Sequence, residues 1–171
     1  MDNIILIGMP GCGKSTVGVL LAKNLGLDFL DCDLLIQQTE GKLLHEIITQ
    51  QGGEGFLEIE NRILSGITAT RTVISTGGSA VYGKEAMAHL RRLGHVIYLK
   101  IDYPTLERRL GDYSHRGVVV REGGTLYDMY CERTALYEQY ADAVIDESKT
   151  EGNLSKTVEQ CLRICERLLK S

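Results

Sequence analysis

Several features of multidomain, secreted or membrane-spanning proteins are absent from this sequence. Proline occurs only at Pro10 and Pro104, so no proline-rich linker divides the chain. No apolar run is long enough to cross a bilayer. The chain enters an apolar run at once, without the basic leader and cleavable apolar stretch of a secretory signal. The 171 residues fit one α/β domain. We therefore expect a single domain over residues 1–171, cytoplasmic and without a membrane partner.

Positive charge is not in excess, because 19 Lys and Arg residues face 23 Asp and Glu residues, for a net charge of −4. This balance gives little support for unspecific nucleic-acid binding, so we expect no nucleic-acid partner, and we expect a monomer. The five cysteines are scattered and lack the close spacing of a zinc knuckle. Cys161 and Cys165 share a helical face, but no histidine or second pair accompanies them, so we expect packed, reduced thiols.

Short apolar runs alternate with amphipathic segments along the chain. The runs predict strands at 3–8, 28–31, 72–75, 95–100 and 143–146. The amphipathic segments predict helices at 14–25, 34–38, 43–51, 58–68, 85–93, 103–110, 126–140 and 154–169. The runs at 4–7 and 96–99 are apolar on both faces, as buried parallel strands are. We predict an α/β fold, a doubly wound five-stranded parallel sheet with helices on both faces, whose ligands bind at the carboxyl ends of the strands.

The clearest motif is G-x-x-x-x-G-K-S at residues 8–15, directly after the first predicted strand and at the start of the first helix. Its glycines allow the backbone amides to surround phosphate oxygens at the positive end of the helix dipole. Lys14 adds a charge near the β and γ phosphates, and the Ser15 hydroxyl is placed to ligate Mg²⁺. The motif predicts a P-loop NTPase domain in which these residues bind ATP: Gly11, Cys12, Gly13, Lys14, Ser15 and Thr16.

Two further motifs follow predicted strands. Asp31 and Asp33 end the second strand, where one carboxylate could hold Mg²⁺ and the other could orient or deprotonate a substrate hydroxyl. An Asp at this position is also a common helix N-cap. Gly77 and Gly78 follow the third strand and would let a ligand approach the main chain, although a strand-ending glycine pair is often only a turn.

Residues 111–125 carry four glycines and two arginines without a clear period, which favours an active-site lid over a disordered segment. Phosphoryl transfer needs cations over the moving charge, and a closing lid would bring Arg116 to the phosphates and exclude water. Arg109 precedes the lid and Arg133 lies on the helix after it. Arginines on patterned helices elsewhere are expected to be solvated: Arg91, Arg92, Arg163 and Arg167.

Taken together, these motifs resemble the shikimate kinase family nearly end to end. The resemblance rests on motifs that occur in the same order as in the family: residues 8–16, Asp31 and Asp33, Gly77 and Gly78, Arg116, and the segment 132–142. It implies phosphoryl transfer from the co-substrate ATP, with Mg²⁺, to the 3-hydroxyl of shikimate, on a sheet with a substrate-binding helical segment at about 33–62. The implied roles are these: Asp31 near Mg²⁺, Asp33 on the acceptor hydroxyls, Gly77 and Gly78 offering amides, Arg116 on the γ-phosphate, Arg109 on adenine, and Arg133 on the acceptor carboxylate. Lys14, Asp33 and Arg116 are the expected catalytic residues.

Three positions depart from the family pattern. Leu57 replaces an arginine that helps to bind the shikimate carboxylate, Ser79 replaces a third glycine, and residues 116–119 read RGVV instead of RPLL. A lost charge-assisted bond is worth roughly 1.5 to 3 kcal/mol, unless Arg62, Arg121 or His115 compensates. The alternatives are a shikimate kinase with a remodelled carboxylate site, a relative acting on another hydroxy acid or polyol, a nucleotide-binding regulatory protein without transfer activity, and a nucleoside monophosphate kinase.

Overall fold

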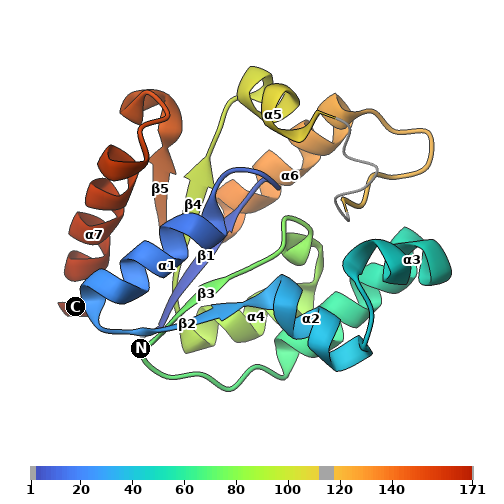
Figure 1. Ribbon diagram of the computed structural model, residues 1–171, viewed down its shortest axis with the longest axis horizontal. Helices are drawn as coiled ribbons and strands as arrows, with labels where there is room; N and C mark the ends of the chain where they lie inside the picture. The colour runs from blue at the N-terminus through green and yellow to red at the C-terminus, as the bar shows by residue number, and fades with distance from the viewer. Residues whose placement is uncertain (1–2, 112–117, 171) are drawn as a thin grey trace.

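The computed structural model describes residues 3–111 and 118–170. Five strands form one sheet in the order β2-β3-β1-β4-β5, and every neighbouring pair is parallel (Figure 1). The strands are β1 (Asn3–Gly8), β2 (Asp28–Asp31), β3 (Thr72–Ser75), β4 (Gly94–Lys100) and β5 (Ala143–Asp146). The predicted parallel sheet is thus confirmed, and only β4 differs in its bounds, starting one residue early.

Strand β1 occupies the centre of the sheet, and all six of its residues are buried. Its register places Leu6 opposite Ser75 of β3 and Ile97 of β4. Because β3 lies on one side of β1 and β4 on the other, the chain reverses direction across the sheet here, which is where doubly wound folds bind ligands. The P-loop at the end of β1 therefore emerges at this switch point.

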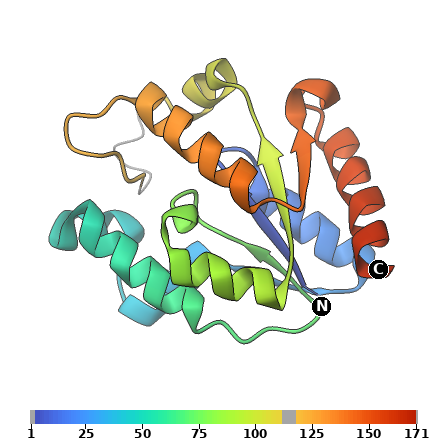
Figure 2. The same cartoon turned by 180° about the vertical axis from the view of Figure 1, so that it is seen from behind.

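Helices cover both faces of the sheet, as the sequence predicts. Helices α1 (Lys14–Leu25) and α7 (Leu154–Lys170) lie on one face, and α4 (Lys84–Leu93) and α6 (Leu126–Tyr140) lie on the other (Figures 1 and 2). The remaining elements are α2 (Cys32–Glu40), α3 (Leu44–Ser65), α5 (Tyr103–Leu110) and the short 3-10 helices η1 (Ala80–Tyr82) and η3 (Glu147–Thr150). None of the described helices has the length and apolar character to span a membrane.

Helix α3 consists of two helical parts that meet in a kink at Gly52, so the prediction of two helices at 43–51 and 58–68 holds, with the second part beginning earlier than predicted. The chain continues through residues 52–57, with a single break at Gly52, whose φ of 72° and ψ of 173° are not helical. Glycine takes this positive φ without a steric penalty, so the first helical part ends before Gly52 and the chain changes direction into the second part. The stretch after Gly52 packs against the core through Phe56, which is buried.

Helix α2 also starts earlier than predicted, at Cys32 instead of Leu34. Asp31 caps it, since its Oδ1 accepts hydrogen bonds from the backbone N–H groups of Asp33 and Leu34, at 2.9 and 3.2 Å. The N-cap alternative for Asp31 therefore holds. Of the predicted lid, residues 118–125 contain neither helix nor strand, and residues 112–117 lie outside the described part of the chain.

Candidate functional site

The P-loop connects β1 to α1 and ends at Gly13, which has a φ of 91°. The first helical hydrogen bond of α1 runs from Val17 N–H to the Gly13 carbonyl, at 2.9 Å. The N–H groups of Lys14, Ser15 and Thr16 thus precede the helical ladder. Amides in this position, at the positive end of the helix dipole, can bind an anion. The local geometry therefore suits the phosphate site that the motif predicts.

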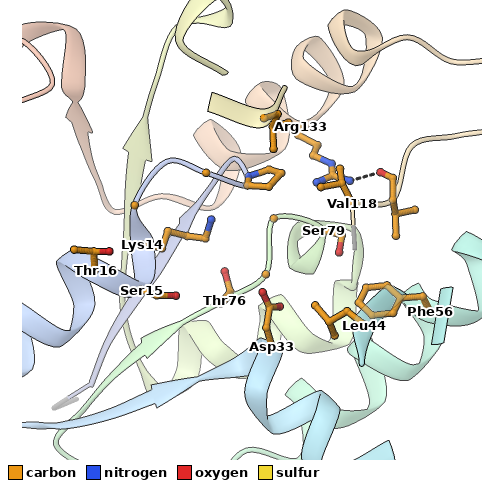
Figure 3. A pocket seen from close by; sticks show the side chains of 17 residues that line it. Lys14, Ser15, Thr16, Asp33, Leu44, Phe56, Thr76, Ser79, Val118 and Arg133 are labelled. Carbon is orange, nitrogen blue, oxygen red and sulfur yellow. Dashed lines mark hydrogen bonds between the residues drawn. The ribbon is translucent and has the colours of Figure 1, made fainter. Parts of the chain in front are cut away.

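Lys14 lies inside the loop with 7% of its surface exposed. Its Nζ donates hydrogen bonds to the carbonyl oxygens of Gly8 and Met9, both at 2.8 Å. Cys12 beside it is fully buried, and burial raises the pKa of its thiol, so the thiol remains protonated. The two hydrogen bonds to the carbonyl oxygens hold the ammonium group of Lys14 next to a cavity of about 280 Å³, which Lys14 lines together with Asp33 and Arg133 (Figure 3).

Ser15 and Asp31, the predicted metal ligands, are in direct contact. Ser15 Oγ donates a hydrogen bond to Asp31 Oδ2 at 2.7 Å and lies 3.3 Å from Ser75 Oγ. Hydroxyl and carboxylate oxygens suit Mg²⁺, which usually retains several waters and shares its shell with substrate phosphates. Within the described ranges no cluster of three or more His, Cys, Asp or Glu side chains could hold a metal by itself. The donor set fits a magnesium ion that is bound together with the nucleotide.

Asp33 projects from the first turn of α2 toward the loop that follows β3 (Figure 3). A Cβ added to Gly77 would lie 2.8 Å from Asp33 Oδ1, so only glycine leaves room for the carboxylate here. Burial raises the pKa of Asp33; the positive charge of Lys14 opposes this shift, and the negative charge of Asp31 reinforces it. A partly desolvated carboxylate with a raised pKa is a better proton acceptor, as a general base requires.

Arg133 is almost completely buried, with 1% of its surface exposed. One terminal nitrogen donates a 2.5 Å hydrogen bond to the carbonyl oxygen of Val119, and the guanidinium carbon lies 5.4 Å from the centre of the Tyr82 ring. A Cβ on Gly78 would lie 3.0 Å from the other terminal nitrogen. The structure therefore brings Arg133, Gly77, Gly78 and Asp33 to one cavity, as the sequence predicts.

The other predicted arginines lie apart from this cavity or outside the described residues. Arg109 lies over the P-loop, donating to the Gly11 carbonyl at 3.2 Å and to Glu147 Oε2 at 2.8 Å. Arg116, and with it the predicted contact to the γ-phosphate, falls outside the described residues. Of the candidate substitutes for the missing clamp, Arg62 pairs with Glu40 and Arg121 pairs with Glu132, while His115 is not described.

Leu57 lies in the wall of a neighbouring cavity of about 360 Å³, together with Tyr82 and Val119. The cavity that holds Asp33 is instead lined by Phe56, the residue before it. Arg133 lines the Asp33 cavity, and its guanidinium lies over the ring of Tyr82, which lines the neighbouring cavity. Leu57 thus shares a cavity wall with Tyr82, the ring that the Arg133 guanidinium covers, and it carries no charge.

One pair of polar residues was missed by the sequence analysis. Glu60 is 2% exposed, and its Oε2 accepts a hydrogen bond from Ser79 Oγ at 2.6 Å. Its Oε1 has no hydrogen-bond partner among the described residues and would lie 2.7 Å from a Cβ added to Gly77. Burial raises the pKa of Glu60 to about 7. The available signal was helical spacing, because Glu60 shares the buried face of α3 with Phe56 and Leu64.

A glycine-rich loop with a buried lysine, facing a carboxylate and a buried arginine on a doubly wound sheet, defines a P-loop phosphotransferase. A shikimate kinase model matches residues 10–166, so the chain belongs to the shikimate kinase family. Shikimate kinase 2 of Yersinia pseudotuberculosis is 36% identical over 171 residues, covering 95% of each chain. The predicted class, an ATP-dependent kinase that phosphorylates a hydroxyl group, is thereby confirmed.

Solved structures agree with this assignment. A shikimate kinase from Acinetobacter baumannii in complex with shikimate has a TM-score of 0.83 and 29% identity, over 96% of this chain and 92% of that chain. A shikimate kinase from Aquifex aeolicus has a TM-score of 0.79 and 29% identity, over 96% of both chains.

Proposed function

We propose that this chain transfers the γ-phosphoryl group of ATP to the 3-hydroxyl of shikimate. The observation that carries the proposal is the arrangement of one cavity: Lys14 lies at the nucleotide end, Asp33 lies beside the Gly77–Gly78 loop, and buried Arg133 lies across that loop. A carboxylate suits a hydroxyl group, and an arginine suits a carboxylate group. An acceptor that carries both groups, as shikimate does, matches the two ends of the cavity.

At the nucleotide end, the amides of residues 11–16 and the Lys14 ammonium would hold the phosphates of ATP. Arg109 would contact the adenine, in keeping with its place over the P-loop, and Arg116 would reach the γ-phosphate. Ser15 and Asp31 would hold Mg²⁺, which neutralises charge on the phosphates when it is bound. The protein would act as a cytoplasmic monomer on small molecules, and its net charge of −4 gives no support for a nucleic-acid partner.

At the acceptor end, Asp33 would orient the reacting hydroxyl and receive its proton as the oxygen attacks the γ-phosphorus. The bond from that phosphorus to the β,γ-bridging oxygen breaks at the same stage, and ADP leaves. The amides of Gly77 and Gly78 would contact the acceptor, and Arg133 would pair with its carboxylate. Arg133 is the only arginine among the described residues that line this cavity, and Leu57 lies in the wall of the neighbouring cavity.

A coupled assay of ADP release tests the proposal, with shikimate, quinate, gluconate, threonine, homoserine, AMP, CMP and UMP as acceptors. We expect turnover of shikimate well above the ATPase background. Lys14→Ala, purified in parallel, should lose this turnover by a factor of at least about 10², because a phosphate ligand is removed from the transition state. ADP release that does not depend on shikimate would overturn the proposal.

A second candidate is favoured by Leu57 and Ser79, which remove one cation from the acceptor site and add one hydroxyl to it. These changes suit a hydroxy acid or polyol that is bound mainly through its hydroxyl groups and depends less on charged contacts to a carboxylate. Preferential turnover of another compound in the same panel would replace shikimate with that acceptor.

A further inference from the structure

Ser79 is one of the hydroxyl side chains that line the acceptor cavity, and its hydrogen-bond direction is fixed. It lines the cavity with Asp33 and Arg133, and it is 7% exposed (Figure 3). Its Oγ donates a 2.6 Å hydrogen bond to Oε2 of Glu60, which lies behind the cavity wall with 2% of its surface exposed. The single hydroxyl proton of Ser79 is therefore directed away from the cavity.

The direction of this proton decides what Ser79 can bind. A serine hydroxyl has one donor and two acceptor lone pairs. Since Glu60 takes the donor, Ser79 can only accept hydrogen bonds on its cavity side. A ligand hydroxyl can supply the required donor, whereas a ligand carboxylate has none and would place its lone pairs against those of Ser79.

Arg133, whose guanidinium lies beside the Gly78 backbone that precedes Ser79, has the complementary preference. Arg133 carries only donors, and its position is fixed by burial and by its bond to Val119. Leu57 adds no second cation beside it. With a single charged contact on the carboxylate, the orientation of the acceptor depends more strongly on the contacts made to its hydroxyl groups.

We propose that Ser79, held by Glu60, is a specificity-determining residue that accepts a hydrogen bond from a non-reacting hydroxyl of the phosphate acceptor. Asp33 takes the reacting hydroxyl, Ser79 takes a second one, and Arg133 takes the carboxylate. The family pattern has glycine at position 79, so this contact belongs to the present chain. The inference rests on the proposed function, since it assigns a place to a hydroxyl of shikimate that does not react.

The experiment removes the proposed contact from the protein by substitution of Ser79, and from the acceptor by use of deoxy analogues. Wild type, Ser79→Ala and Ser79→Thr are assayed at about pH 8 with shikimate, 4-deoxyshikimate and 5-deoxyshikimate. We expect Ser79→Ala to raise KM for shikimate about fivefold to tenfold, the worth of one neutral hydrogen bond, with a smaller change in kcat. For the analogue that lacks the contacted hydroxyl, the same substitution should leave KM unchanged. Ser79→Thr keeps the hydroxyl and should restore the wild-type preference.

Equal changes in KM for all three acceptors would overturn the inference, because a merely structural role for Ser79 affects every acceptor alike. Ser79→Gly removes the same hydroxyl and serves as a second variant if the alanine variant does not fold. Turnover of shikimate by wild type, together with equal changes in the variants, would overturn the role of Ser79 and leave the proposed function standing. Absence of shikimate turnover by wild type would overturn both.

Discussion

The hydroxyl of Ser15 donates a 2.7 Å hydrogen bond to Oδ2 of Asp31, which joins the start of helix α1 to the end of strand β2. The second carboxylate oxygen of Asp31 caps helix α2. One side chain thus serves the fold with one oxygen and faces the proposed metal site with the other. The two roles differ in their need for charge, because an amide oxygen caps a helix about as well as a carboxylate does.

Asp31→Asn should therefore separate the two roles. We expect the affinity for ATP in the presence of Mg²⁺ to fall about tenfold, since the hard cation loses a charged oxygen. The free energy of unfolding should change little, while Asp31→Ala should also lose about 1 kcal/mol through the missing cap. Titration calorimetry and urea unfolding measure the two effects. An undiminished MgATP affinity in Asp31→Asn would exclude Asp31 from the metal site.

Asp33→Asn should abolish transfer while sparing nucleotide binding. The amide cannot accept the proton of the acceptor hydroxyl, so we expect kcat to fall by roughly 10² to 10⁴, the usual worth of a general base. MgATP affinity should stay within about twofold of wild type, because a general base contacts the acceptor and not the phosphates. Steady-state kinetics and calorimetry provide the comparison. A kcat equal to that of wild type would show that another group receives the proton.

Leu57→Arg should restore a second cation next to Arg133. Position 57 lies beside Tyr82, whose ring is under the Arg133 guanidinium, so an arginine there adds charge on the carboxylate side. We expect KM for shikimate to fall about tenfold or more, from a charge-assisted bond. Leu57→Met, which has similar volume and no charge, is the matched control. If both variants kept the wild-type KM, the acceptor carboxylate would lie elsewhere.

Glu60→Gln should remove part of the pH dependence of stability. Burial raises the pKa of Glu60 from its ordinary value of 4.5 to about 7 in the folded protein. Between these values the folded state binds more protons than the unfolded state, so the contribution of Glu60 to stability is greatest at low pH. It declines as the pH rises to about 7, by an amount on the order of 3 kcal/mol.

Urea unfolding of both proteins at about pH 5 and about pH 7.5 checks this expectation. Relative to wild type, Glu60→Gln should gain stability at the higher pH, because glutamine avoids the cost of a buried charge. Ser79 offers a matched comparison, since Ser79→Ala removes the hydrogen bond and keeps the carboxyl group. The same pH dependence in wild type and Glu60→Gln would show that Glu60 has an ordinary pKa.

Cys131 should be the first thiol to react with iodoacetamide. It is exposed on α6, whereas the other four cysteines are buried. Burial also raises the pKa of these buried thiols, that of Cys165 to about 12, and the thiolate is the reactive form. Mass spectrometry of peptides over time should show one fast site, absent from Cys131→Ser. Rapid labelling of Cys12 would instead indicate that the P-loop opens in solution.

The sequence by itself determined the features that depend on neighbouring residues. Strand β1 is apolar on both faces, and the P-loop motif is contiguous from Gly8 to Ser15, so the sheet and the phosphate site follow from local patterns. Asp31 and Asp33 were found in the same way, because the carboxyl end of a parallel strand is a predictable place for a ligand. The alternation of strands and helices predicted the doubly wound parallel sheet, but not the order of its strands.

The tertiary structure alone decided the features that depend on distant residues. Glu60 and Ser79 come from different elements, and their hydrogen bond arises only when α3 packs against the loop after β3. The start of the second part of α3 directly after Gly52 and the position of Leu57 in a separate cavity depend on the same packing. Periodicity records which side of an element is buried, but the partners and the desolvation of a buried group are set by segments far away in the chain.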